Sequence, residues 1–367
     1  VTQMLRHLLS SVGNRVGVIG TLGTFIGDDQ IPSARTTPES PDLFKLLAQM
    51  VAASVDTVCM EVSSHALELE RVAGITFDIA IFTNLTQDHL DFHETMENYF
   101  LAKQKLFTNK RAKAAVICTD DQWGNRLLSI TDAAQVVSVG PGSDWKVENV
   151  ETNLSGITSF NLVGPDVNCI VEIPMYGIFN AMNAALCLAA CAILGYDPSN
   201  LASRFNSLPQ VAGRMQVVTN SQQITALVDY AHTPDAVEKV LANIRTASPK
   251  KLVAVLGCGG NRDALKRPIM GAVAAQIADV VVVTDDNPRY EAPDQIRAEI
   301  LSGITDSTAE IIEIGDRRIA IRTALKLAEP GTVVAVLGKG HEIGQEVSGV
   351  VYEFDDAQVI REESANV

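Results

Sequence analysis

At 367 residues, the chain is long enough for two domains that each have a hydrophobic core. Its formal net charge is −15, from 29 basic and 44 acidic residues, and the basic residues form no stripe, so nucleic acid is not expected as a partner. The apolar runs are too short to span a bilayer and no signal peptide is recognisable, so membrane insertion is not expected. The six cysteines lie in apolar surroundings without a CxxC pair, which is typical of reduced thiols in a cytoplasmic protein.

The first part of the chain alternates apolar segments of helical and strand periodicity. The predicted strands are residues 16–19, 57–62, 79–82 and 114–117, and the predicted helices include residues 1–12, 37–53, 121–130 and 180–194. Residues 145–173 have the alternation and glycine turns of antiparallel strands. This pattern predicts an α/β domain over residues 1–212.

The second part, residues 213–367, repeats strand–helix units. Its predicted strands are residues 224–229, 252–256, 279–284, 310–314 and 332–337. Polar clusters follow four of these strands, with the sequences DYAHTPD, GCGGNRDALKRP, DDNPRY and GKGHE. Because the carboxyl ends of parallel strands meet at one edge of a sheet, we predict that these clusters form a site there.

The densest set of reactive side chains lies in residues 82–107. A strand there leads into a turn and then into a helix that carries Lys103; the turn holds Asn84, Asp88, His89, Asp91 and His93. An ordinary polar loop beside a half-buried lysine is the alternative interpretation. Glu61, inside an apolar strand, needs either a bound cation or a structural hydrogen bond. Five of the six histidines, at 65, 89, 93, 232 and 341, lie at strand ends, which favours a functional interpretation.

Two glycine-rich segments resemble nucleotide-binding motifs but do not match them. Residues 257–263, GCGGNRD, fail the GxGxxG pattern of dinucleotide folds, and Gly338-Lys339-Gly340 lacks the hydroxyl residue of a P-loop. Arg262 together with Asp286-Asn287-Pro288-Arg289 could instead bind a zwitterionic amino acid. A turn stabilised by the Asn-Pro pair is the alternative.

These motifs together resemble the Mur ligase family over essentially the whole chain. They are EVSSHAL (61–67), NLTQDHLDFH (84–93), AK (102–103), GIFNAMN (177–183), GRM (213–215), DYAHTPD (229–235), GCGGNRDALKRP (257–268), DNPR (286–289) and GKGHE (338–342). The resemblance implies an α/β fold with a central ATP-binding domain of the P-loop type over residues 1–212, whose P-loop strand is missing. It implies a Rossmann-like, amino-acid-binding domain over residues 213–367.

The implied reaction is ATP-dependent ligation of meso-diaminopimelate to UDP-N-acetylmuramoyl-L-alanyl-D-glutamate, through an acyl phosphate, in peptidoglycan precursor synthesis. ATP and Mg²⁺ are the implied cofactors, and the enzyme is expected to be a cytoplasmic monomer. The DNPR sequence resembles family members that take meso-diaminopimelate. Arg289 would pair with the distal carboxylate, which lysine lacks.

The resemblance also implies residue roles. Glu61, His89 and Lys103, the last as a carbamate, match the catalytic metal ligands. Asn183, Arg214, Asp229 and His232 match ATP-binding residues. Thr36, Thr37, Ser63 and Arg71 match contacts to the UDP-linked dipeptide. Arg262, Asp286, Asn287, Arg289, Gly338 and Glu342 match the diaminopimelate pocket.

The sequence departs from the family pattern in two places. Leu69 stands where some relatives have a substrate-contacting glutamine. The family's phosphate-binding loop, of the GTNGKTT type, and a uridine-nucleotide domain are expected before Val1. Because that loop supplies several donors to developing charge, we expect this chain alone to be inactive or nearly so, as a fragment of an active ligase.

Three alternatives stay open at this point. The same reaction could use L-lysine. A metallohydrolase built on His89 and His93 would hold zinc tightly and would not depend on a nucleotide. A non-catalytic protein that naturally lacks the P-loop would bind diaminopimelate without turnover.

Overall fold

The computed structural model describes residues 1–31, 35–221 and 224–365, and these divide into two units. The first unit consists of Val1–Val150, Ser159–Ile173 and Phe179–Leu208. The second consists of Glu151–Thr158, Pro174–Ile178 and Pro209–Val367. Each unit is described below by itself.

The first sheet of the first unit has the strand order β3-β2-β1-β4. Its elements are α1 (Thr2–Ser11), β1 (Val16–Gly20), β2 (Gly23–Ile26), β3 (Asp29–Ile31), α2 (Ser40–Ala52), β4 (Thr57–Met60) and α3 (Ser64–Glu68). Strand β1 is parallel to β4 and antiparallel to β2. The parallel pair places Gly20 and Glu61 next to each other, because the Glu61 amide donates to Ile19 O. The hairpin β2–β3 was not predicted, since its residues are largely polar or glycine.

The second sheet of this unit is parallel, with the order β5-β6-β7. Its elements are β5 (Phe77–Phe82), α4 (Leu90–His93), α5 (Met96–Gln104), η1 (Lys105–Phe107), β6 (Ala112–Cys118), α6 (Gln122–Ile130) and β7 (Gln135–Val139). Phe82, Phe100 and Phe107 are buried together in its core. This packing fixes α5, the helix that carries Lys103, against the sheet.

A third sheet, in the order β10-β9-β8, contains the strands predicted within residues 145–173. Its strands are β8 (Lys146–Thr152), β9 (Thr158–Gly164) and β10 (Val167–Ile173). The helices α7 (Ile178–Ile193), α8 (Pro198–Ala202) and η2 (Ser203–Ser207) follow. Helix α7 is rich in alanine and almost completely buried from Ala184 to Cys191, in agreement with the core helix read from its sequence.

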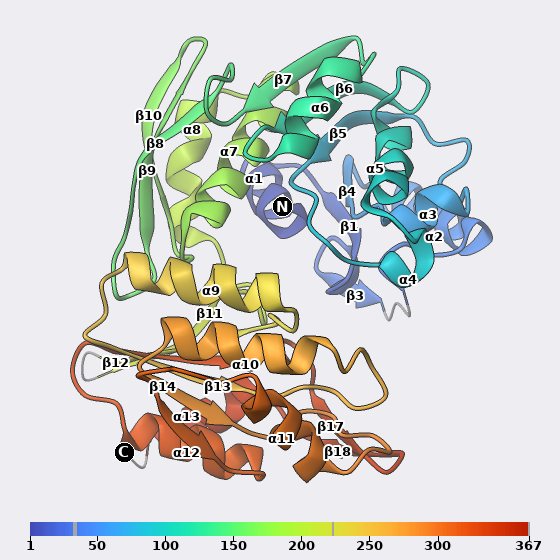
Figure 1. Cartoon of the computed structure of the whole chain (residues 1–367). Coiled ribbons are helices and arrows are strands. Elements are labelled where there is room, and N and C mark those ends of the chain that lie inside the picture. The colour runs from blue at the N-terminus through green and yellow to red at the C-terminus, as the bar shows by residue number, and fades with distance from the viewer. Residues whose placement is uncertain (32–34, 222–223, 366–367) are drawn as a thin grey trace. The chain divides into compact units, whose positions relative to one another are not determined.

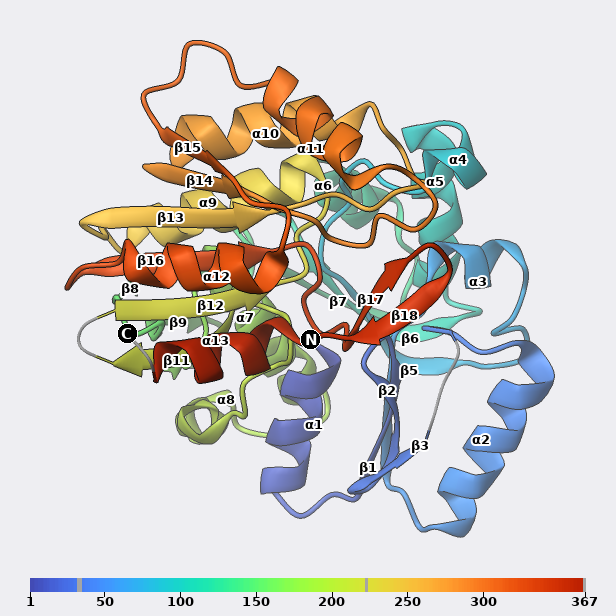
Figure 2. The same ribbon diagram turned by 90° about the horizontal axis from the view of Figure 1, so that it is seen from below.

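In the part of the second unit that the structure describes (overview in Figure 1), a sheet has the order β11-β12-β16-β13-β14-β15, which can be followed in Figure 2. The strands are β11 (Gln216–Ser221), β12 (Ile224–Asp229), β13 (Lys251–Leu256), β14 (Val280–Val283), β15 (Glu310–Glu313) and β16 (Thr332–Leu337). The helices are α9 (Pro234–Thr246), α10 (Lys266–Ile277), α11 (Pro293–Ser302), α12 (Arg317–Lys326) and α13 (Asp356–Ser364). Strands β12 to β16 are mutually parallel, and β11 is antiparallel to β12. The repeated strand–helix units predicted after Gly213 are therefore confirmed.

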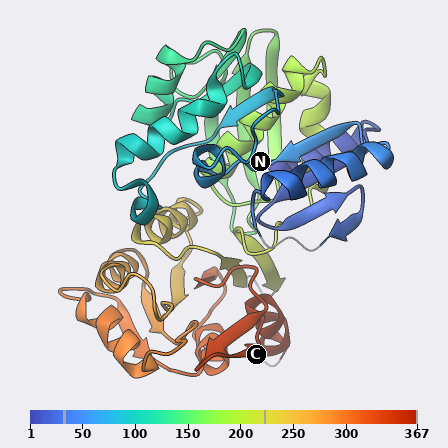
Figure 3. The ribbon, with the colours of Figure 1, turned by 90° about the vertical axis from the view of Figure 1, so that its right-hand side faces the viewer.

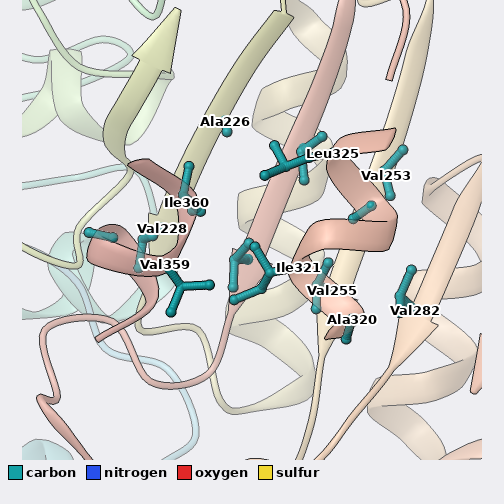
Figure 4. Close-up of a cluster of buried hydrophobic side chains, with 14 of the residues drawn as sticks. Ala226, Val228, Val253, Val255, Val282, Ala320, Ile321, Leu325, Val359 and Ile360 are labelled. Atoms are coloured by element: carbon teal, nitrogen blue, oxygen red, sulfur yellow. The ribbon is translucent and has the colours of Figure 1, made fainter. Parts of the chain in front are cut away.

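Helices cover both faces of this sheet. Figure 2 shows α12 and α13 in front of the strands, and Figure 3 shows the gold and orange helices α9 to α11 on the opposite side from the red α13. Ile321 and Leu325 of α12, and Ile360 of α13, pack onto strand valines in one buried cluster (Figure 4). Strands buried on both faces read as continuous apolar runs, as VVVV of β14 does.

The register of the parallel strands brings their polar ends together. Asp229 of β12 lies opposite Leu337 of β16, and Leu256 of β13 lies opposite Val283 of β14. The residues that follow each strand therefore meet at one edge of the sheet, as the sequence predicted. A hairpin of β17 (Gly344–Val347) and β18 (Val350–Glu353), which was not predicted, adds to this edge.

Across the residues that the structure describes, none of the helices combines the length and the apolar character needed to cross a membrane.

Candidate active site

Glu61 follows strand β4 and is held by threonine side chains. Its Oε2 accepts hydrogen bonds from the Thr21 amide (2.9 Å) and hydroxyl (2.7 Å), and its Oε1 accepts one from Thr2 Oγ1 at 3.1 Å. A Cβ atom at Gly20 would lie 2.8 Å from the Glu61 carboxyl carbon, so a larger residue there would displace the Glu61 carboxylate from this position. The structural hydrogen bond left open by the sequence is therefore present, and further lone pairs on both oxygens can still bind a cation.

Four predicted dipeptide contacts lie beside Glu61 in the first unit. Thr21 Oγ1 is 3.1 Å from Thr36 Oγ1. Thr37 Oγ1 donates to Glu61 O at 2.8 Å and accepts from the Ser63 amide at 3.0 Å. Arg71 is buried, and its Nη1 donates to Thr37 O at 3.2 Å. These residues thus form one hydrogen-bonded group of threonines, a serine and an arginine, suited to a carboxylate and an amide.

Arg71 also pairs with a carboxylate that the sequence did not single out. Its Nη2 lies 2.8 Å from Glu39 Oε1, at the start of α2. Its Nε atom is buried and has no hydrogen-bond partner within the described residues. A buried guanidinium that keeps an unsatisfied donor is suited to an anionic ligand.

The histidines of the first unit form a cluster around Tyr99. His93 stacks on the Tyr99 ring at 4.9 Å between centroids, and its Nε2 is 2.8 Å from Ser64 Oγ. The His89 ring lies 4.9 Å from His65 and 6.0 Å from Tyr99, edge-on in both cases. Burial lowers the pKa of His65 and of His93, so their rings favour the neutral form. His89 has a left-handed backbone (φ 54) and lies at the start of α4.

Lys103 lies on the same tyrosine. Its Nζ is 5.2 Å from the centre of the Tyr99 ring. Burial lowers the pKa of this amine, and the nearby Asp88 opposes that shift. A lysine with a lowered pKa is uncharged for a larger share of the time than an exposed lysine. Carbamate formation requires this neutral amine, because the neutral amine attacks CO₂.

The side chains of the first unit could supply a magnesium ion with only a few protein ligands. Among residues 1–31, 35–221 and 224–365, no three His, Cys, Asp or Glu side chains are arranged to hold a metal. Mg²⁺ commonly uses one or two protein oxygens and takes the rest from water and phosphate. Glu61 and a carbamate on Lys103 would each offer such an oxygen, and His89 would offer a ring nitrogen.

The residues predicted to bind ATP lie in both units. Asn183 is on α7 in the first unit. In the second unit, Tyr230 connects the others: Arg214 Cζ lies 5.1 Å from its ring, and the His232 ring lies 4.6 Å from it. Asp229 is buried, and its carboxylate accepts from the amides of Met215 (2.7 Å) and Ala231 (2.8 Å). Burial raises the pKa of Asp229, and these two amides counteract the rise.

Four of the residues predicted for the amino-acid pocket lie close together just after the C-terminal ends of strands β14 and β16. Asn287 Nδ2 donates to Glu342 Oε2 at 2.9 Å. A Cβ atom at Gly338, whose φ is +111, would lie 2.6 Å from Asp286 Oδ2. Asp286 and Asn287 are both buried. Two carboxylates and an amide thus lie close together at this edge of the sheet, and groups of this kind can recognise an amino acid.

The side chains of Arg262 and Arg289, the two arginines predicted for this pocket, run past Gly259. A Cβ atom there would lie 2.8 Å from Arg289 Nη1 and 3.9 Å from Arg262 Cγ. Arg289 Nη1 donates to Gly260 O at 2.8 Å, and its Nε donates to Glu346 Oε2 at 3.1 Å. The Arg289 backbone is left-handed (φ 52), because its amide and carbonyl both pair with the β17 hairpin. The guanidinium is therefore held in place before any ligand arrives.

Sequence reasoning missed three residues of this pocket, Lys339, Gln345 and Glu346. The sequence placed Lys339 in the GKGHE motif and in a failed P-loop pattern without giving it a role, yet its side chain is completely buried and points at Asn287. Gln345 Nε2 donates to Asp286 O at 2.7 Å, and Glu346 pairs with Arg289. The sequence does contain one unusual feature that could have pointed to Lys339. It is a lysine between two glycines, directly after a completely buried strand.

Comparison with known proteins agrees with this arrangement. Residues 1–191 match the Mur ligase middle domain, and residues 213–340 match the Mur ligase glutamate ligase domain. The UDP-N-acetylmuramoyl-L-alanyl-D-glutamate--2,6-diaminopimelate ligase of Corynebacterium glutamicum is 45% identical over 369 residues, covering 98% of this chain and 71% of that protein. The protein of the same name from Aquifex aeolicus is 41% identical, with 98% and 74% coverage.

Solved structures give the same result. A structure of a UDP-N-acetylmuramoyl-L-alanyl-D-glutamate--2,6-diaminopimelate ligase has a TM-score of 0.74 at 35% identity, covering all of this chain and 75% of that one. The folylpolyglutamate synthase of Mycobacterium tuberculosis shares the fold with a TM-score of 0.70 at 18% identity, with 92% and 85% coverage. On the strength of the two domain matches and these relatives, the chain belongs to the Mur ligase family of ATP-dependent amide ligases.

Proposed function

We propose that this chain carries the ligase activity that joins meso-diaminopimelate to UDP-N-acetylmuramoyl-L-alanyl-D-glutamate in peptidoglycan precursor synthesis. The supporting observation is the pocket formed by Asp286, Asn287, Arg289 and Glu342 in the second unit, with Arg262 beside it. Relatives that are more than 40% identical to the chain over the aligned residues carry this ligase name. The enzyme is proposed to work in the cytoplasm as a monomer.

In the reaction, the γ-phosphoryl group of ATP is transferred to the terminal carboxylate of the UDP-linked dipeptide. The amino group of diaminopimelate then attacks the acyl carbon, loses a proton and displaces phosphate. Thr36, Thr37, Ser63 and Arg71 would hold the dipeptide, since they already form one hydrogen-bonded group. Asn183, Arg214, Asp229 and His232 would hold the nucleotide.

Glu61, His89 and carbamylated Lys103 would hold Mg²⁺, which neutralises phosphate charge when bound. Carbamylation replaces a cation by an anion, so it converts Lys103 into an oxygen ligand. Tyr99 limits where that ligand can lie, because both Lys103 and His89 contact its ring. The protein's own contribution here is to hold these groups in place.

The pocket chemistry favours diaminopimelate over lysine. Both substrates have one α-amino acid group, and only diaminopimelate has a second carboxylate at its distal end. Arg289, held by Gly260 and Glu346, offers a planar guanidinium for that carboxylate. A lysine side chain has no carboxylate to offer this guanidinium, so it would forgo that charge-assisted hydrogen bond.

The test is a calorimetric titration of the chain with meso-diaminopimelate, L,L-diaminopimelate and L-lysine. We expect the meso isomer to bind most tightly, and Arg289→Ala to remove most of its advantage over lysine. Arg245→Ala is the matched control, because Arg245 at the end of α9 also pairs with a carboxylate, that of Asp279, and with a backbone carbonyl, but Asp279 precedes β14 and the pocket residues follow it. Tighter binding of L-lysine by the wild-type chain would contradict the proposal.

A further inference from the structure

Lys339 is a fully buried cation in the amino-acid pocket. It follows Gly338 at the end of β16, and its side chain has a relative exposure of 0%. Its Nζ donates to Asn287 Oδ1 at 3.1 Å and to Gly344 O. Glu342 Oε2 lies 3.5 Å from the same nitrogen, and Asp286 Oδ1 lies 4.0 Å from it. A buried ammonium is costly unless it is paired, and these four oxygens provide the pairing.

This cation fixes the orientation of the Asn287 amide. Asn287 Oδ1 accepts from both Lys339 Nζ and the Glu346 amide, the latter at 2.9 Å. Its Nδ2 donates to Glu342 Oε2 at 2.9 Å. A flipped amide would place an NH₂ group against two donors and an oxygen against a carboxylate, so only one orientation is compatible with these neighbours.

We infer that Lys339 is a positioning residue that sets which polar groups the pocket presents to an amino acid. With Lys339 in place, Asn287 can present only N–H donors toward a ligand, as the arginines do. Asp286 and Glu342 present only acceptors. The pocket is thereby divided into a part that takes a carboxylate and a part that takes an ammonium group. This inference rests on the proposed function, because it concerns recognition of a zwitterionic substrate.

Without the cation, this division is lost. Asp286 and Glu342 would face each other's charge with no cation between them. The Asn287 amide would keep its contacts with the Glu346 amide and Glu342 but lose the third contact that fixes its orientation, so it would be held less firmly. We therefore expect both weaker binding of diaminopimelate and weaker discrimination against lysine, rather than a uniform loss of stability.

The test replaces Lys339 by methionine, which keeps the length of the side chain and removes the charge. Val334→Ala, in the same strand and fully buried, is the control for lost stability without a change in the pocket. Hydrogen exchange of residues 338–348 is measured without ligand, and the affinities for meso-diaminopimelate and L-lysine are measured by calorimetry. We expect Lys339→Met to speed exchange at Glu346 and to weaken diaminopimelate binding at least about tenfold. The ratio of the two affinities should fall, while Val334→Ala changes neither quantity.

Unchanged exchange at Glu346 in Lys339→Met, or equal effects of Val334→Ala, would overturn the inference. If the wild-type chain binds no diaminopimelate while exchange at Glu346 responds as expected, the proposed function fails and the positioning role stands.

If Lys339→Met does not fold, Asn287→Asp is used instead. It keeps the oxygen that faces Lys339 and replaces only the donating nitrogen. Wild-type affinity for diaminopimelate in Asn287→Asp would then overturn the inference.

Discussion

Arg317 and Asp356 form an ion pair that is completely buried. Arg317 Nε donates to Asp356 Oδ1 at 2.8 Å and its Nη2 donates to Oδ2 at 2.7 Å, and both side chains have a relative exposure of 0%. The same Nη2 donates to Leu337 O at 3.0 Å, immediately before Gly338. The pair therefore joins α12 and α13 to the strand end that carries the amino-acid pocket.

Breaking this pair from one side should be severe. Arg317→Met leaves the Asp356 carboxylate buried without its cation, and we expect a loss of about 3–5 kcal/mol in the free energy of unfolding. The double variant Arg317→Met with Asp356→Leu should recover a large part of that loss, because no unpaired charge remains. Urea denaturation of the two single variants and the double variant measures the coupling. If the stability losses of the two single variants simply add up in the double variant, the two residues are not coupled and the prediction is wrong.

Lys103 should form a carbamate. Because burial lowers the pKa of its amine, the neutral form that attacks CO₂ is more abundant than for an exposed lysine at the same pH. Carbon-13 NMR in ¹³C-bicarbonate should show a carbamate signal that strengthens as the pH rises from about 6 to about 8. Lys103→Arg should abolish the signal, whereas Lys105→Arg, on an exposed side chain in the next turn, should not. A signal that persists in Lys103→Arg would assign the modification elsewhere.

Gly338 should not tolerate a side chain. Its φ is +111 and a Cβ atom would lie 2.6 Å from Asp286 Oδ2, so Gly338→Ala is expected to cost about 2 kcal/mol and to displace Asp286. Gly331→Ala is a matched control at the other end of β16, because φ is +93 there and the nearest atoms belong to the flexible Lys250 side chain. Thermal unfolding should show a loss in both variants. Only Gly338→Ala should also lose diaminopimelate binding.

Acid should weaken the contact between α12 and α13. Hydrogen bonds from Arg322 and Arg318 lower the pKa of Glu363 from 4.5 to about 2. A carboxyl group with a lower pKa in the folded state stabilises the fold above its unfolded pKa, and this contribution disappears as the pH falls from about 4.5 toward about 2. The stability difference between the wild type and Glu363→Gln should therefore be constant near neutral pH and shrink in that acidic range. Chemical denaturation at a series of pH values measures this stability difference. A difference that stays constant down to pH 2 would contradict the prediction.

The sequence predicted the parts of this protein that depend on local patterns. The apolar runs identified β12, β13, β14 and β16, and parallel pairing then required the polar ends of these strands to meet. The cluster around His89 and Lys103 could be anticipated because its members lie within one short segment. Their common contact, Tyr99, could not be singled out, because nothing in the sequence distinguishes it from the other aromatic residues of this segment.

The roles of Lys339 and Glu346 could not be predicted, because they depend on how the β17–β18 hairpin packs. Glu346 meets Arg289, which lies 57 positions earlier in the chain. The hairpin is short, and its valines and tyrosine are largely exposed, so it has no strong apolar pattern. For Glu61, the sequence left a cation and a structural hydrogen bond open, and the structure shows that Thr21 supplies the latter.

One backbone hydrogen bond connects the proposed nucleotide residues of the second unit to the amino-acid pocket. The Gly338 amide donates to Asp229 O at 3.1 Å, and the Asp229 carboxylate in turn holds the Met215 amide next to Arg214. We therefore expect a substitution at Gly338 that changes the choice of amino acid also to shift the groups assigned to ATP. Variants selected for a new amino acid should carry altered nucleotide affinity with them, and compensating changes should be found near Asp229 rather than in the pocket itself.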